Sequence, residues 1–170
     1  DCRVYQDSLK ARPAGFSERF GFAEPNPLQA AIVSLPVESE HTRLLVAEAE
    51  TGSGKTEAAL ARFFGLFAAG KVDGLYFALP TRVAARQLYD RVRGYVERHF
   101  PDPQMRPAVV LAVPGYARVD NLPVERILPN ETVQWEDDLQ QSHRARLWAA
   151  EWPKRFLAAT IAVGTIDQAL

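Results

Sequence analysis

The residues best suited to chemistry stand in one short stretch, Ala49-Glu50-Thr51-Gly52-Ser53-Gly54-Lys55-Thr56. An apolar run over residues 44–47 precedes it, and an alanine-rich helical pattern over residues 57–69 follows it. The order of strand, glycine loop and helix is typical of a phosphate-binding loop. We expect the backbone N–H groups of Gly52, Ser53 and Gly54 to surround phosphate oxygens at the positive end of the helix dipole.

Two side chains give this loop its expected chemistry. Lys55 would reach the β- and γ-phosphates of a nucleoside triphosphate, and the Thr56 hydroxyl would hold Mg²⁺. A dinucleotide fingerprint does not fit, because Glu57 stands where a third glycine is needed. Lys55 and Thr56 are therefore the predicted catalytic residues. The predicted nucleotide contacts in the loop are Thr51, Gly52, Ser53, Gly54, Lys55 and Thr56.

Length and composition narrow the class of protein. The 170 residues, of which 47% are hydrophobic and 24% charged, are enough for one soluble globular domain. A formal net charge of −1 means that any nucleic-acid contact must depend on local groups. The single cysteine, Cys2, excludes an internal disulfide framework, and no apolar run approaches the length of a membrane span. Because the chain starts at Asp1 and stops just after a helix-start signal, we expect a piece of a longer protein.

Helical patterns alternate with buried strands along the rest of the chain. We expect strands over residues 44–47, 75–79, 108–113 and 158–163. Helices are expected from the cap Asn26 to Pro36, from the cap Thr81 onward, over about 139–150, and after Thr165, whose spacing to Gln168 fits a capping box. Residues 1–24 are interpreted as a linker or the edge of a preceding domain, and 114–138 as a loop. This alternation predicts a parallel sheet covered on both faces.

Four stretches stand in the order found in superfamily 2 helicases. Pro25-Asn26-Pro27-Leu28-Gln29, the phosphate loop with Ala49 in place of the usual first glycine, Leu79-Pro80-Thr81-Arg82 and the closing run 163–170 resemble their Q, I, Ia and Ic motifs. The amino-acid sequence of residues 153–170 most resembles that of the helicase–nuclease of type I CRISPR systems. Over residues 25–170 the resemblance implies an α/β, three-layer, RecA-like P-loop NTPase domain with a mostly parallel sheet, truncated before the family's Asp-Glu-x-His strand.

The resemblance also implies roles for residues outside the loop. Gln29 would read the adenine edge of ATP, although it could instead complete a capping box with Asn26. Free N–H groups at helix starts and the Arg82 cation would contact backbone phosphates of single-stranded DNA, although ordinary helix caps and a solvated arginine explain the same residues. The predicted nucleic-acid contacts are Pro80, Thr81, Arg82, Gly164 and Thr165.

The expected function is that of an ATP-dependent DNA helicase or translocase of a type I CRISPR antiviral system, with ATP and Mg²⁺ as cofactors. Expected partners in the cytoplasm are single-stranded DNA, a CRISPR RNA-guided surveillance complex and a second RecA-like domain of the same chain, with no membrane involved. The alternatives are another superfamily 2 RNA or DNA helicase, and a nucleotide-binding module without hydrolysis. The catalytic acid, the arginine finger and the nuclease would lie outside the sequence, so residues 1–170 alone should not hydrolyse ATP.

Overall fold

The computed structural model describes residues 2–11, 15–38, 44–103, 106–113, 116–119, 122–124 and 159–169. The chain divides into two compact units, Asp1–Asp73 and Gly74–Leu170. The described residues of the first unit form helices, and those of the second form a sheet with its helices.

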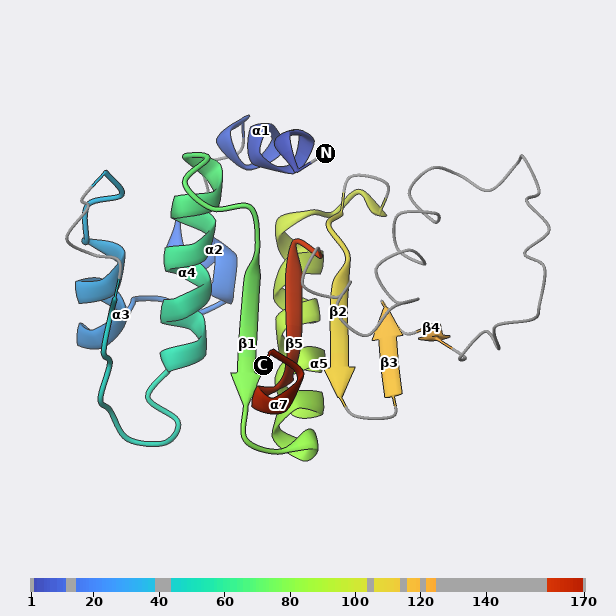
Figure 1. The fold of residues 1–170 in the computed structure, drawn as a ribbon. Coiled ribbons are helices and arrows are strands. Elements are labelled where there is room, and N and C mark those ends of the chain that lie inside the picture. The colour runs from blue at the N-terminus through green and yellow to red at the C-terminus, as the bar shows by residue number, and fades with distance from the viewer. Residues whose placement is uncertain are drawn as a thin grey trace, which may run out of the picture. The chain divides into compact units, whose positions relative to one another are not determined.

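The first unit is built around one amphipathic helix. Its helices are α1 (Arg3–Ala11), α2 (Phe16–Phe20), α3 (Pro27–Val33) and α4 (Lys55–Ala68) (Figure 1). Helix α4 repeats apolar residues at helical spacing, and Leu60, Phe63, Phe64 and Phe67 are each at most 4% exposed. Helices α1 and α3 pack against α4. The helix expected after the phosphate loop is therefore confirmed.

Two helices occupy the stretch that the sequence suggests is a linker. In α2 the rings of Phe16 and Phe20, one turn apart, lie 4.8 Å from each other, and Phe20 is buried. In α1 Leu9 is buried as well. Short helices with so few apolar residues are weak in isolation, because a helix this short depends on packing for its stability. Contact with the rest of the unit explains why an irregular pattern is helical here.

The strand expected over residues 44–47 is wrong. These residues are not part of any strand, and Leu44 and Val46 are 81% and 89% exposed. An isolated β-strand leaves its N–H and C=O groups without partners, so a strand needs a neighbour. None of the described strands pairs with this segment. The apolar pattern is present, but no described residue supplies the pairing that would make it a strand.

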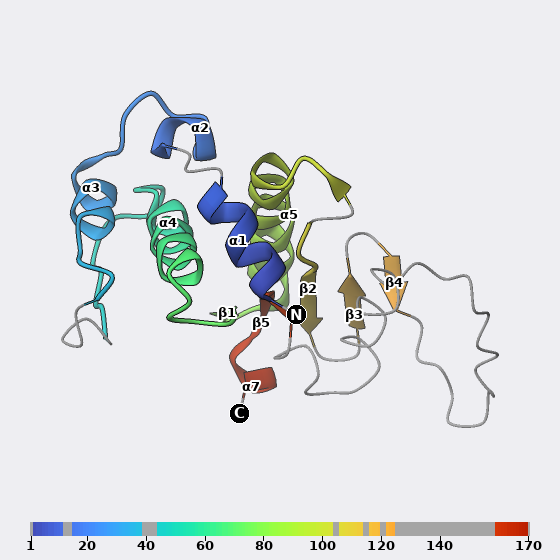
Figure 2. The same ribbon diagram turned by 90° about the horizontal axis from the view of Figure 1, so that it is seen from above.

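The second unit contains one five-stranded sheet in the order β1-β5-β2-β3-β4 (Figures 1 and 2). The strands are β1 (Leu75–Leu79), β2 (Val109–Val113), β3 (Tyr116–Val119), β4 (Leu122–Val124) and β5 (Ile161–Thr165). Strand β5 pairs in parallel with β1 on one side and β2 on the other. An α/β fold with three parallel strands is thus confirmed, although the strand expected over residues 158–163 lies at Ile161–Thr165.

The loop expected over residues 114–138 is wrong for part of its length. Strand β3 pairs antiparallel with β2, and β4 pairs antiparallel with β3. The edge of β2 that does not face β5 provides backbone partners, which a weak sequence pattern does not reveal. The helix expected over residues 139–150 lies outside the described residues.

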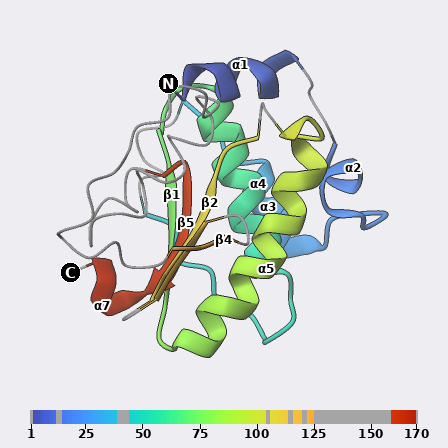
Figure 3. The same ribbon diagram turned by 90° about the vertical axis from the view of Figure 1, so that its right-hand side faces the viewer.

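Helix α5 (Arg82–His99) lies along one face of this sheet and contacts β1, β2 and β5 (Figure 3). Its inner face repeats Ala85, Tyr89, Val92 and Val96, all 0% exposed. The Thr81 hydroxyl accepts a hydrogen bond from the backbone N–H of Ala84 at 3.2 Å, so the expected cap is confirmed. No helix among the described residues, α5 included, is both long and apolar enough to cross a membrane.

Gly164 is a point of close approach between neighbouring strands of the sheet. It lies in β5 between Ala78 of β1 and Ala112 of β2. A Cβ atom added there would collide with the carbonyl oxygen of Ala112 and the hydroxyl of Tyr76. Because the first obstacle is backbone of a paired strand, it cannot move aside without disturbing the ladder. The sheet therefore requires glycine at this position for space.

We expect Gly164→Ala to lower the stability of the second unit by about 1–3 kcal/mol, the cost of forcing an extra methyl into a packed site. Gly94 of α5 is the matched control, because an added Cβ meets nothing within 4 Å there. Gly94→Ala should raise stability by about 0.5–1 kcal/mol through its better helix propensity. Thermal unfolding of the full-length variants measures both changes. Shifts of the same sign and size for the two variants would contradict the close approach.

Candidate functional site

The glycine loop leads directly into the first turn of α4. Gly52 and Gly54 have left-handed φ angles of 85° and 75°, which other residues rarely adopt. Gly54 precedes the first helical residue, and no side chain caps the helix there. The loop therefore delivers the N-terminus of a 14-residue helix with no side-chain acceptor at its cap, as a phosphate-binding loop requires.

The ammonium group of Lys55 lies over the loop itself. Its Nζ donates hydrogen bonds to the carbonyl oxygens of Ala49 at 2.5 Å and Glu50 at 2.6 Å, and to Ser53 Oγ at 3.4 Å. These oxygens are neutral acceptors, and Lys55 is exposed. An anionic phosphate oxygen is a stronger acceptor for an ammonium group than a carbonyl. The cation is thus held at the loop by contacts that a phosphate can replace.

Helix α3 begins with a complete capping box. The backbone N–H of Asn26 donates to Gln29 Oε1 at 2.9 Å, and the backbone N–H of Gln29 donates to Asn26 Oδ1 at 3.0 Å. The capping role considered for Gln29 is therefore confirmed. Its side chain is buried, with Gln29 only 5% exposed, and reading of adenine by Gln29 stays a prediction.

The same two side chains also contact the phosphate loop. Asn26 Nδ2 donates to the Ser53 carbonyl at 2.8 Å, and Gln29 Nε2 lies 3.3 Å from the Gly54 carbonyl, to which it donates. Sequence reasoning identified Asn26 only as a cap and missed this second contact. The available signal was the residue type, because asparagine caps a helix with its oxygen and keeps an N–H donor to spare.

The expected nucleic-acid contacts meet at one edge of the sheet. Strands β1 and β5 run in parallel, and Leu79, the last residue of β1, pairs with Thr165, the last residue of β5. Pro80, Thr81 and Arg82 therefore emerge next to the end of β5. Helix α5 lies on one side of the sheet, and α7 (Ile166–Ala169) lies on the other (Figure 3). The edge at which parallel strands end is where open α/β sheets bind ligands.

The predicted nucleic-acid contacts at this edge differ in their exposure to solvent. Pro80, Thr81 and Arg82 are exposed, but Thr165 is only 3% exposed. The Thr165 hydroxyl has no hydrogen-bond partner among the described residues, so the capping box expected with Gln168 is wrong. Thr165 is still a strand residue, paired with Leu79, and it is buried. A phosphate contact from Thr165 stays a prediction.

Tyr76 holds the end of β5 and was missed from the sequence. Its hydroxyl donates a hydrogen bond to the carbonyl oxygen of Thr165 at 2.9 Å. Burial, and secondarily the negative charge of Asp167, raises the pKa of the Tyr76 phenol above its usual value. The room for this hydroxyl comes from the missing side chain of Gly164. A tyrosine in one strand facing glycine in the next is the signal that could have found it.

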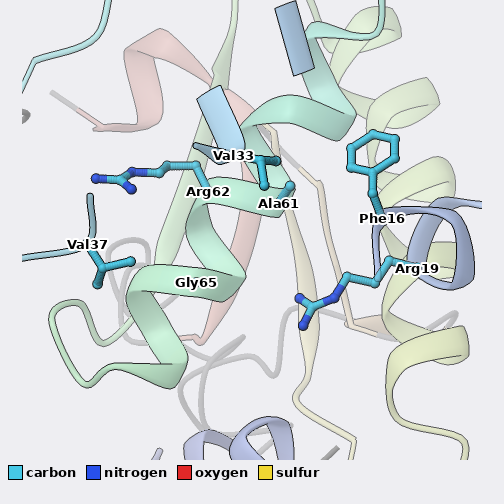
Figure 4. A pocket seen from close by; sticks show the side chains of 7 residues that line it. All are labelled: Phe16, Arg19, Val33, Val37, Ala61, Arg62 and Gly65. Atoms are coloured by element: carbon cyan, nitrogen blue, oxygen red, sulfur yellow. The ribbon is translucent and has the colours of Figure 1, made fainter. Parts of the chain in front are cut away.

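A pocket of about 200 Å³ lies elsewhere in the first unit, lined by residues of α2, α3 and α4 and by Val37 (Figure 4). Arg62 in its wall donates to the carbonyl oxygens of Leu35 at 2.6 Å and Pro36 at 2.9 Å. Arg19 lies 5.7 Å from the ring centre of Phe64, and burial lowers its pKa, against the opposing charge of Glu18. No phosphate-loop residue lines this pocket, so it is distinct from the candidate nucleotide site.

Comparison with curated proteins finds related sequences under one name. The CRISPR-associated endonuclease/helicase Cas3 of Thermus thermophilus is 36% identical over 166 residues, which is 95% of this chain and 17% of that protein. The protein of the same name from Escherichia coli K12 is 29% identical over 147 residues, 86% of this chain and 15% of its own. The CRISPR-associated nuclease/helicase Cas3 of Streptococcus thermophilus is 28% identical over 158 residues, which is 91% of this chain and 16% of that protein.

The chain is thus related to Cas3 along most of its length, and it spans about a sixth of the length of the curated relatives it matches. No protein-family model matches the chain. No solved structure matches it significantly.

The Tyr76 hydrogen bond gives a testable dependence on pH. The phenol has a raised pKa in the folded protein, so its contribution to stability is complete below the ordinary tyrosine pKa of about 10 and is lost as pH rises through the higher folded value. We expect Tyr76→Phe to be less stable than wild type by about 1 kcal/mol at pH 7. The difference should shrink above about pH 10. Denaturant titrations of both proteins from pH 7 to 11 measure it, and a constant difference would contradict this role.

Proposed function

We propose that the chain is the nucleotide-binding part of an ATP-dependent helicase of a type I CRISPR system, with a RecA-like fold. The relationship to Cas3 proteins, whose names include helicase and nuclease or endonuclease, supports this assignment. The observation that carries it is the glycine loop with Lys55 at the start of α4. A helicase needs an ATP site of this kind to drive its movement along DNA.

The residues of the loop fit a Mg²⁺-bound nucleoside triphosphate. An added Cβ at Gly52 would meet nothing within 4 Å, so the backbone there is accessible to a bulky ligand. Lys55 would move from the Ala49 and Glu50 carbonyls to the β- and γ-phosphates and offset the charge that develops during attack by water. Thr56 would hold Mg²⁺, which supplies further positive charge to the phosphates.

Single-stranded DNA would lie along the sheet edge formed by the ends of β1 and β5. Arg82 is exposed there in the first turn of α5, and the Pro80-Thr81 segment is exposed beside it. Contacts of a cation and helix-start N–H groups with backbone phosphates carry affinity without sequence preference. Binding without sequence preference suits a protein that must move along DNA of any sequence.

The rest of the activity would come from other parts of a longer protein. We place the acid that positions water, the arginine finger of a second RecA-like domain and the nuclease outside residues 1–170. We propose that the full-length protein acts in the cytoplasm on DNA held by a CRISPR RNA-guided surveillance complex. The names of its relatives support an association with CRISPR, and the small share of their length that this chain covers supports a longer protein.

We expect Lys55→Ala in the full-length protein to lower DNA-stimulated ATP hydrolysis by at least about 10²-fold, because the loop loses its only side-chain cation. Lys71→Ala is the control. Lys71 is an exposed lysine of the same unit, and its Nζ lies 2.6 Å from Glu38 Oε2 in a salt bridge. That variant should hydrolyse ATP at the wild-type rate. Steady-state ATPase with saturating single-stranded DNA is the measurement. Near-wild-type turnover by Lys55→Ala would overturn the phosphate assignment.

We expect Arg82→Ala to weaken binding of all single-stranded DNA sequences alike. The slope of log affinity against log salt concentration should fall by roughly 0.7, the value for one lost phosphate contact. Arg91→Ala is the control, an exposed arginine about two and a half turns further along α5, and its slope should equal that of wild type. Titrations of the full-length variants at several salt concentrations measure the slopes. If Arg82→Ala and wild type had the same slope, single-stranded DNA would not bind along the edge formed by the ends of β1 and β5.

A further inference from the structure

Two side-chain amides at the start of α3, those of its cap Asn26 and of Gln29, donate to two consecutive carbonyls of the phosphate loop. Asn26 Nδ2 lies 2.8 Å from the Ser53 oxygen, and Gln29 Nε2 lies 3.3 Å from the Gly54 oxygen. The Gly54 oxygen also accepts the helical hydrogen bond from the N–H of Ala58 at 3.1 Å. The residues at the junction of loop and helix are therefore tied to a helix that precedes them by some 25 residues in sequence.

Holding these carbonyls also orients the amides of the next residues. A trans peptide group is planar, and its C=O and N–H bonds point in opposite directions. The Ser53 carbonyl belongs to the same peptide group as the Gly54 N–H, and the Gly54 carbonyl to that of the Lys55 N–H. With both oxygens drawn toward α3, both N–H groups point away from it. These are the groups at the start of α4, where a phosphate would bind.

The capping box fixes which end of each side-chain amide faces the loop. Asn26 Oδ1 and Gln29 Oε1 are held by the two backbone N–H groups of the box, so each NH₂ group is left to donate elsewhere. Gly54 makes room for both, because an added Cβ would collide with Gln29 Nε2 and lie 3.3 Å from Asn26 Nδ2. Replacement of Gly54 would disturb the contact as well as its left-handed φ.

We propose that Asn26 is a positioning residue for phosphate binding, and that with Gln29 it keeps the N–H groups of Gly54 and Lys55 directed at the phosphates. This inference rests on the proposed nucleotide site. It gives the start of α3 a role in phosphate binding, and this role is separate from any recognition of the adenine base. Loss of the contact should therefore weaken binding of any polyphosphate by the same factor, with or without a base.

Asn26→Ser separates this role from helix capping, because serine caps a helix as well as asparagine but has no N–H donor that reaches the loop. The Mg²⁺ complexes of ATP and of inorganic tripolyphosphate are the probes, titrated against the full-length protein by competition with a fluorescent ATP analogue. We expect both affinities to fall by a similar factor of up to roughly tenfold, the worth of one hydrogen bond. Ser34→Ala is the control, since among the described residues Ser34 Oγ donates its hydrogen bond to its own helix end, to the Ala31 carbonyl at 2.9 Å.

A second variant guards against a folding defect. Asn26→Asp keeps the capping oxygen, yet its carboxylate faces the Ser53 carbonyl and cannot donate, so its loss should be at least as large. Thermal unfolding of each variant measures the effect on stability separately. Unchanged affinities in both variants, or loss for ATP with none for tripolyphosphate, would overturn the positioning role while leaving the nucleotide site in place. Failure of the wild-type protein to bind ATP would overturn both proposals.

Discussion

The hydrogen bonds between the first turn of α3 and the glycine loop are the constraint on which the candidate nucleotide site depends. Glycine is the residue that loses the most conformational freedom on folding, and this loop contains two in left-handed geometry. A loop of that composition adopts one shape only if its surroundings impose it. Here Asn26 and Gln29 impose it from one side, and Lys55 from within. The entropic cost of order is met during folding, so it need not be met when a ligand arrives.

The sheet edge of the second unit depends on a different kind of constraint, which is space. Gly164 lets Tyr76 cross the sheet surface and hold the last carbonyl of β5. Tyr76 packs against a small buried cluster of Val110, Ala112 and Ala162. The Tyr76 hydrogen bond therefore adds to the backbone pairing of Leu79 with Thr165 in holding the end of β5. The missing side chain of Gly164 makes room for it.

Much of this organisation could be predicted from local pattern. The helices α4 and α5 and the strands β1, β2 and β5 follow from apolar periodicity, and the starts of α3 and α5 follow from Asn26 and Thr81. The failures share one cause, because each depended on a partner distant in sequence. Residues 44–47 lack a strand to pair with among the described residues, whereas 116–119 gained one from β2. Thr165 was expected to cap a helix but remains paired with Leu79.

The site follows the same division. Lys55, the glycines and the capping box could be predicted, because their geometry is set within a few residues. The contact from Asn26 to Ser53 and that from Tyr76 to Thr165 join residues 27 and 89 positions apart. Contacts between residues so far apart along the chain produce no periodic pattern in the sequence. Such contacts become visible only when the fold brings the two segments together.

The exposed apolar run before the phosphate loop has a practical consequence for protein production. Leu44, Leu45 and Val46 are β-forming or apolar side chains that are 81%, 43% and 89% exposed, and no described strand covers their backbone. An exposed apolar run whose backbone has no described strand beside it can pair with the same run of another copy. Self-association of residues 1–170 that rises with protein concentration would be the sign of such pairing.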